Sequence, residues 1–197
     1  MITHSNLFAA ACSVSGVSDL ISFQGQIVRD GISNQGFVET GQIRMAASLW
    51  QKPELYIANS PIFSVDKITT PILLMHNTID EGVPFSQAIE FFTALRRLQK
   101  PSWLLEYAEG NHYVSGKSST DFTIRMQQFF DYYLKDSLPP EWMTKGRPAR
   151  LKGVDDRLRL DTSGRRPGPG LLTEEEKKKI NNYSKIPLKE KLRRTEP

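Results

Sequence analysis

Residues 72–87, "ILLMHNTIDEGVPFSQ", carry an apolar run that ends abruptly in polar residues. Four strand-forming residues lead into His76 and Asn77, and a carboxylate, Asp80, follows just before a glycine and a proline. The run predicts a buried strand, and the residues after the proline predict a helix. A strand of this kind places Asp80 at the carboxyl edge of a sheet, where ligands and chemistry gather in α/β proteins.

The segments around this stretch alternate between strand and helix patterns. Residues 20–62 are rich in glycine and are predicted to be irregular, with candidate helices at 41–50 and 52–63. The alternation predicts parallel β-α units and therefore an α/β fold. The predicted strands are 7–17, 70–76 and 102–108, and the predicted helices are 84–99 and 118–136, the last with an apolar face of Phe122, Met126, Phe129, Phe130 and Tyr133.

A second strand also ends in polar residues. The strand at 102–108 gives way to "EGNH", residues 109–112. Parallel strands joined by one helix release their loops at the same edge of the sheet, so we expect Asp80 and His112 to approach each other across 32 positions. A carboxylate that accepts the imidazole Nδ1–H fixes the tautomer and supports a general base near neutral pH.

Each of these residues alone has a simpler explanation. An Asp in a Gly-Pro turn is usually a turn former, and a His in a loop is usually solvated. The pair at consecutive strand ends favours catalysis more than either residue does. The order of acid and then histidine is the one that α/β-hydrolases use after their serine.

Residues 6–142 resemble the C-terminal half of the catalytic domain of prolyl oligopeptidase-type serine peptidases. The motifs are "PILLMHNxxDxxVPxxQ" from residue 71, "ALRRLQKP" from residue 94 and "EGNH" from residue 109. The resemblance implies the C-terminal portion of an α/β-hydrolase fold and a peptide substrate, with no cofactor and no metal. It also implies Asp80 as the acid and His112 as the base of a Ser-His-Asp triad. Asn77 stands where such enzymes often have glycine.

The resemblance places the nucleophilic serine in a G-x-S-x-G elbow, on a strand-to-helix turn upstream of Asn6. We therefore expect that this chain supplies only the acid and the base, and that alone it is inactive. Ser13, Ser15 and Ser60 lack the elbow pattern and are not favoured as substitutes. A truncated gene, a mis-assigned start and the C-terminal partner of a split enzyme all fit. In the last case the upstream half of the same enzyme is the expected partner.

Length and composition are those of one globular domain with an appendage. The chain has 197 residues and one cysteine, Cys12, which excludes an intramolecular disulfide framework and a cysteine-rich zinc site. No apolar run approaches the roughly 20 residues that a membrane-spanning helix needs, so we expect no membrane partner. The N-terminus lacks the pattern of a signal peptide, and the cellular compartment stays open.

The positive charge is concentrated at the C-terminal end. Residues 144–197 carry 16 Lys and Arg against 8 Asp and Glu, whereas residues 1–143 carry 10 against 14. We predict a partial peptidase domain at 1–143 and a basic, partly disordered tail with one short helix at 144–197. Tyr183 is the only aromatic residue in the tail, so nucleic acid is not the expected partner.

Two other function classes remain open. An acid–histidine pair serves acyl transfer in general, so an esterase-like α/β-hydrolase fragment is one alternative. A degenerate hydrolase that binds a partner without catalysis is the other. The combined peptidase motifs favour peptide substrates over the first alternative, and a salt-dependent affinity of residues 144–197 for nucleic acid would indicate the second.

Overall fold

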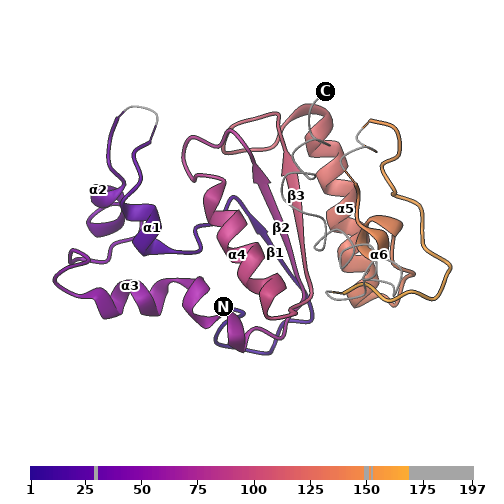
Figure 1. The fold of residues 1–197 in the computed structure, drawn as a ribbon, viewed down its shortest axis with the longest axis horizontal. Helices are drawn as coiled ribbons and strands as arrows, with labels where there is room; N and C mark the ends of the chain where they lie inside the picture. The colour runs from indigo at the N-terminus through magenta and orange to yellow at the C-terminus, as the bar shows by residue number, and fades with distance from the viewer. Residues whose placement is uncertain (29–30, 149–150, 152, 169–197) are drawn as a thin grey trace, which may run out of the picture.

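Three parallel strands in the order β1-β2-β3 form the centre of the molecule. The computed structural model describes residues 1–28, 31–148, 151 and 153–168 (Figure 1). The strands are β1 (Ala11–Val14), β2 (Ile72–Asn77) and β3 (Ser102–Tyr107). All six residues of β2 are buried, as expected for a central parallel strand that is covered on both faces.

The register of the sheet brings the carboxyl ends of the strands together. Asn77 at the end of β2 pairs with Tyr107 at the end of β3, while Val14 at the end of β1 pairs with Met75. The turns that follow β2 and β3 therefore leave the sheet side by side. This confirms the common edge that the sequence predicted.

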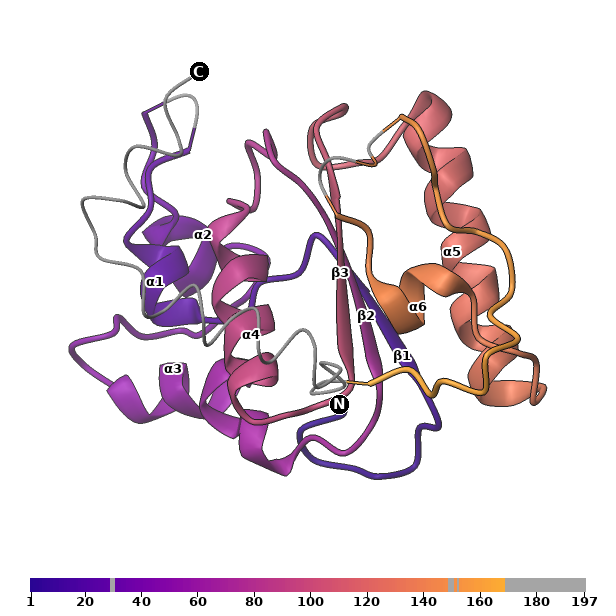
Figure 2. The same cartoon turned by 45° about the vertical axis from the view of Figure 1, so that its right-hand side comes forward.

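Helices cover the two faces of the sheet. Helix α4 (Ser86–Arg97) packs on one face, and α5 (Gly116–Leu134) lies on the other with α6 (Glu141–Lys145) (Figures 1 and 2). The last turn of α4 carries Arg96 and Arg97, which stabilise the negative end of the helix dipole. The described residues between β1 and β2 form four short helices, which are α1 (Leu20–Gln24), α2 (Gln35–Glu39), α3 (Pro53–Asn59) and the 3-10 helix η1 (Pro61–Lys67).

Alternate residues of β2 supply two separate hydrophobic clusters. Side chains along a strand point to opposite faces, so Ile72 and Leu74 pack toward α4 while Leu73 and Met75 pack toward α5. The first cluster consists of Val65, Ile68, Ile72, Leu74, Phe91 and Leu95. The second consists of Leu73, Met75, Phe122, Phe129, Trp142 and Met143.

Most of the predicted elements are present, and two differ. The strand predicted at 7–17 is limited to Ala11–Val14, and the candidate helix at 41–50 is absent. Arg44 and Ala46 have φ values of 56°, which a right-handed helix cannot contain. Their segment instead lies against α2, where the Met45 N–H donates to the Val38 carbonyl. The candidate at 52–63 corresponds to α3 and the start of η1.

The residues after α5 fold back onto it. The Arg125 side chain bonds Asp121 and also donates to the Asp156 carbonyl at 2.9 Å, while Gln128 donates to Leu158. The Asp161 carboxylate is buried, and hydrogen bonds from Ser163 and Thr144 hold its pKa well below the ordinary range.

The boundary predicted between the peptidase domain and the tail, at residues 143 and 144, falls inside α6. The division into these two parts stays a prediction. The short helix predicted for the tail lies outside the described residues. Within the ranges that the structure describes, no helix is both long enough and apolar enough to cross a membrane.

Phe129 offers a test of how α5 packs. Its side chain is 0% exposed against Trp103 and Tyr133, whereas the neighbouring Phe130 is only half-buried. Phe129→Ala is expected to lower the free energy of unfolding by about 3–5 kcal/mol, because the cavity it leaves cannot collapse fully. Phe130→Ala is the matched control, and urea unfolding should show a clearly smaller loss. A Phe129→Ala loss below roughly 1 kcal/mol would contradict this packing.

Candidate active site

Asp80 lies in the turn that follows β2, with its carboxylate buried. Its side chain is 0% exposed, and Oδ1 accepts the backbone N–H groups of Gly82 at 2.9 Å and Val83 at 2.8 Å. Backbone donors fixed by the turn stabilise the charged form of a carboxylate and hold its orientation. The turn thus gives the acid a defined direction.

His112 meets this carboxylate from the loop after β3. Its Nδ1 lies 2.9 Å from Oδ2 and 3.2 Å from Oδ1 of Asp80. A carboxylate can only accept, so Nδ1 carries the proton and Nε2 is the nitrogen available to take one. The His112 side chain is 39% exposed, in contrast to the buried acid. The structure therefore brings together the two residues that the sequence singled out.

His76, the fifth residue of β2, lies directly behind the acid. It is 1% exposed, and its Nε2–H donates to the Val83 carbonyl at 2.7 Å and lies 3.4 Å from Asp80 Oδ2. Its Nδ1 has no hydrogen-bond partner among the described residues. His76 thus helps to enclose the carboxylate without competing with His112 for it.

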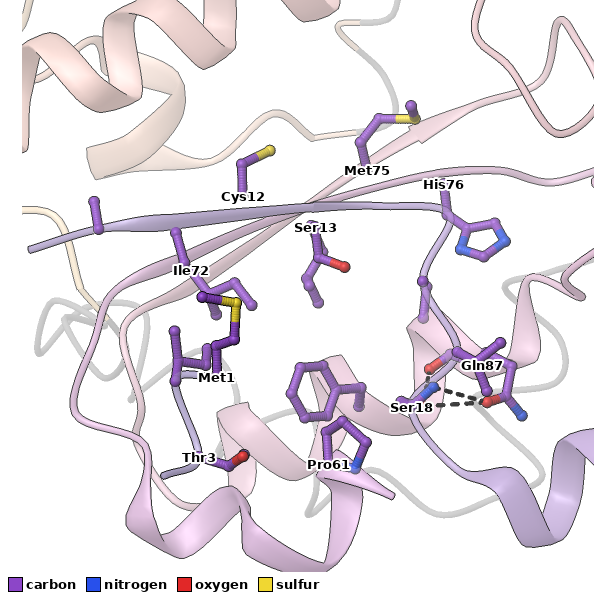
Figure 3. A pocket seen from close by; sticks show the side chains of 18 of the residues that line it. Met1, Thr3, Cys12, Ser13, Ser18, Pro61, Ile72, Met75, His76 and Gln87 are labelled. Carbon is purple, nitrogen blue, oxygen red and sulfur yellow. Dashed lines mark hydrogen bonds between the residues drawn. The ribbon is translucent and has the colours of Figure 1, made fainter. Parts of the chain in front are cut away.

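A cavity of about 490 Å³ extends from His76 along the face of β1 and β2. Figure 3 shows Ser13 and Ile72 on the sheet side with Met1 beside Ile72, Pro61 opposite, and the Ser18–Gln87 hydrogen bonds at one end. Most of its lining is apolar. The cavity therefore adjoins the buried side of the acid–histidine pair.

The serines of this region are engaged elsewhere. Ser15 Oγ donates to the backbone carbonyl of His112 at 3.1 Å, and Ser60 Oγ donates to the Tyr56 carbonyl at 2.6 Å. Ser13 lines the cavity. Among the described residues, no serine hydroxyl is hydrogen-bonded to the His112 ring. Neither Ser13, Ser15 nor Ser60 has the geometry of an activated nucleophile here.

Apart from the Asp80–His112 pair, the described residues offer neither a reactive thiol nor a metal site. Burial raises the pKa of the Cys12 thiol to about 11, which keeps it protonated and weakly nucleophilic. Over the part of the chain that the structure describes, no cluster of three or more His, Cys, Asp and Glu side chains could hold a metal ion.

The sequence did not reveal that Asn77 and Ser15 contact the loop of His112. Both donate side-chain hydrogen bonds to the loop that carries His112. The signal available in the sequence was the Asn at residue 77, at a position where the resemblance implies glycine.

A model of the prolyl oligopeptidase family matches residues 1–137. Among solved structures, an acylaminoacyl peptidase of Pyrococcus horikoshii superposes with a TM-score of 0.58 at 23% identity, over 70% of this chain and 22% of its own. A puromycin-hydrolyzing peptidase of Mycobacterium tuberculosis superposes with a TM-score of 0.56 at 26% identity, over 68% of this chain and 19% of its own. The second shares sequence as well as fold.

Curated relatives have a similar, partial overlap. The acylamino-acid-releasing enzyme of Rattus norvegicus is 32% identical over 80 residues, which cover 41% of this chain and 10% of that enzyme. The peptidase YuxL of Bacillus subtilis (strain 168) is 26% identical over 115 residues, which cover 58% of this chain and 16% of YuxL. The chain thus corresponds to a small part of each relative.

Replacing the acid tests the buried pair. Asp80→Asn keeps the shape of the side chain but weakens its hydrogen bonds to Gly82, Val83 and His112, so we expect a loss of about 1–3 kcal/mol in the free energy of unfolding. Asp66→Asn, on an exposed carboxylate, should stay within roughly 0.5 kcal/mol of the unsubstituted chain. Equal effects of the two substitutions in urea unfolding would show that Asp80 is not held as described.

Proposed function

This chain belongs to the prolyl oligopeptidase family, and we propose that it carries the acid and the base of a serine peptidase, Asp80 and His112. The observation that supports this most strongly is the 2.9 Å contact between the buried carboxylate and the Nδ1 of a half-exposed imidazole. The contact lies at the carboxyl edge of a parallel sheet, where this fold class performs its chemistry.

The proposed reaction is acyl transfer in two steps. A serine hydroxyl attacks the carbonyl carbon of the scissile peptide bond, and His112 Nε2 takes the hydroxyl proton as the new C–O bond forms. Asp80 stabilises the resulting imidazolium through Nδ1–H. The imidazolium then protonates the leaving amine as the C–N bond breaks, which leaves an acyl-serine.

Water completes the cycle. His112 Nε2 takes a proton from a water molecule, whose oxygen attacks the acyl carbon, and the proton returns to the serine oxygen when the ester bond breaks. Asp80 stays charged throughout. Both steps use Nε2, on the edge of the His112 ring that is turned away from Asp80.

We further propose that the serine comes from a segment outside residues 1–197, the upstream half of the same enzyme. Strand β1 pairs only with β2 among the described residues, so its other edge is open to a further parallel strand. The apolar cavity runs along the same strand, where Ala11 and Ser13 of β1 line it. A strand added to this edge would end near Ser15, and Ser15 contacts the His112 loop.

A second candidate is an α/β-hydrolase that acts on other acyl groups. The alpha/beta hydrolase domain-containing protein 17C of Xenopus tropicalis is 26% identical to this chain over 95 residues. The acid–base pair would serve such a reaction equally well. Peptide and ester substrates assayed side by side distinguish the two functions.

A chimera provides the test of the acid and base. Residues 1–137 replace the matching segment of the Mycobacterium tuberculosis puromycin-hydrolyzing peptidase, which supplies its own upstream half. We expect a fluorophosphonate probe to label the elbow serine, and His112→Ala to lower kcat on peptide substrates by about 10⁴-fold or more. His4→Ala is the matched control, because His4 bonds Thr3 away from the strand ends. Activity that survives His112→Ala nearly unchanged would refute the assignment.

The 197-residue chain by itself should behave differently. Without a serine activated by His112, we expect no labelling by the same probe and no hydrolysis of short peptides, including proline-containing ones. Stoichiometric labelling of this chain would contradict the proposal. Mapping the labelled peptide would then show whether Ser13, Ser15 or Ser60 is the nucleophile.

A further inference from the structure

Residues 108–114 form the loop that carries His112, and within the described part of the chain backbone hydrogen bonds do not hold this loop in place. Among the described residues, no backbone–backbone hydrogen bond involves an N–H or carbonyl of residues 108–114. The His112 ring is 39% exposed, so burial does not hold it either. The position of the base must therefore depend on side chains that reach the loop from elsewhere.

Asn77 provides one of these contacts from a fully buried position. It is 0% exposed at the end of β2, and its Nδ2 donates to the Asn111 carbonyl at 2.6 Å, one residue before His112. The approach is close because Gly110 has no side chain: a Cβ there would lie 3.3 Å from Asn77 Nδ2 and 2.7 Å from the Tyr113 carbonyl. Gly110 also has a φ of 97°, which side-chain-bearing residues rarely adopt.

Burying the Asn77 side-chain amide costs free energy, and packing alone does not explain why a polar residue lies there. Its Oδ1 is buried without a hydrogen-bond partner among the described residues. An apolar residue would fill the end of a buried strand without leaving a polar atom unsatisfied. The hydrogen bond from Asn77 Nδ2 to the Asn111 carbonyl offsets part of this free-energy cost.

Ser15 holds the next carbonyl from the neighbouring strand end. Its Oγ donates to the His112 carbonyl at 3.1 Å, and its own N–H donates to Met75 at 2.9 Å. Ser15 has a φ of 46°, an uncommon conformation for a residue other than glycine. Strained backbone of this kind persists where surrounding contacts require it, and it is frequent at functional sites.

Asn111 joins the loop of the base to the turn of the acid. Its Oδ1 accepts the Glu81 N–H at 2.8 Å, and Glu81 directly follows Asp80. The backbone carbonyl of Asn111 accepts the hydrogen bond from Asn77 Nδ2. The acid and base loops are thus connected through Asn111 as well as through the Asp80–His112 contact.

We infer that Asn77 is a positioning residue for the His112 base, and that Ser15 assists it. Together they fix two successive carbonyls, those of Asn111 and His112, so that the exposed imidazole stays against Asp80. The inference rests on the proposed function for its catalytic meaning. The positioning itself is a property of this chain and can be measured without a serine.

The test is a nuclear magnetic resonance measurement on the 197-residue chain labelled with ¹⁵N-histidine. The chain has three histidines, so few ring signals need assignment. The Nδ1–H proton of His112 reports the bond to Asp80, and its exchange rate with water reports how firmly the ring is held. The Nε2–H proton of His76, bonded to Val83, reports folding of β2 independently.

Asn77→Ala and Ser15→Ala are the informative variants, and Thr78→Val is the matched control. Thr78 follows Asn77 and bonds the Tyr107 carbonyl without touching the His112 loop. We expect the His112 Nδ1–H to exchange roughly tenfold faster in Asn77→Ala, as the loss of one hydrogen bond implies, with a smaller increase in Ser15→Ala. Thr78→Val should leave that rate unchanged, and the His76 signal should persist in all variants.

The outcomes distinguish the proposed function from the positioning role of Asn77. An unsubstituted chain that shows the His76 proton but no His112 Nδ1–H would contradict the Asp80–His112 pair and with it the proposed function. An Asn77→Ala chain with an unchanged exchange rate would overturn the positioning inference alone. If Asn77→Ala also loses the His76 signal, the protein has unfolded, and Ser15→Ala decides by the same criterion.

Discussion

The site depends on the in-register pairing of β2 with β3, from Ile72–Ser102 to Asn77–Tyr107. Because the strands are parallel and end level with each other, the two turns that follow them must leave the sheet as neighbours. That constraint brings the loops of Asp80 and His112 together, and the two side chains meet at 2.9 Å. Shifting the pairing by one residue would turn the β2 side chains to the opposite faces and exchange the two hydrophobic clusters. The two hydrophobic clusters on either side of β2 therefore stabilise this register. The contact between Asp80 and His112 depends on that register.

The environments of the two residues differ in the way that acid–base chemistry requires. Asp80 is enclosed by the backbone N–H groups of Gly82 and Val83 and by His76, which fix the direction of its carboxylate. His112 is exposed on one side, where the proposed reaction has it exchange protons with a serine or with water. The firm hold on its loop comes from Asn77 and Ser15, each at the end of a different strand. All three strands thus contribute to one pair of side chains.

Sequence reasoning recovered what depends on periodicity and strand order. The strand at 72–77 and the helix at 86–97 have patterns that tertiary contacts do not override, and the proximity of Asp80 and His112 follows from parallel topology. It failed where backbone conformation depends on partners outside the segment, as at Arg44 and Ala46, whose segment bonds back to α2. It also could not reveal the return of residues 155–161 onto α5, because Arg125 and Gln128 look like exposed helix residues until their partners are known. Asn77 was noticed only as a departure from glycine, since its partner at residue 111 is set by the loop.

The most direct measurement is to map the adduct of a peptide chloromethyl ketone in the chimera that restores the upstream half. Such a reagent resembles a substrate and alkylates a nearby nucleophilic nitrogen. Our account predicts that mass spectrometry finds the peptidyl group on Nε2 of His112, because Nδ1 is bonded to Asp80 and only Nε2 faces the substrate. Alkylation of His4 or His76 instead, with His112 unmodified, would contradict the assignment of His112 as the catalytic base.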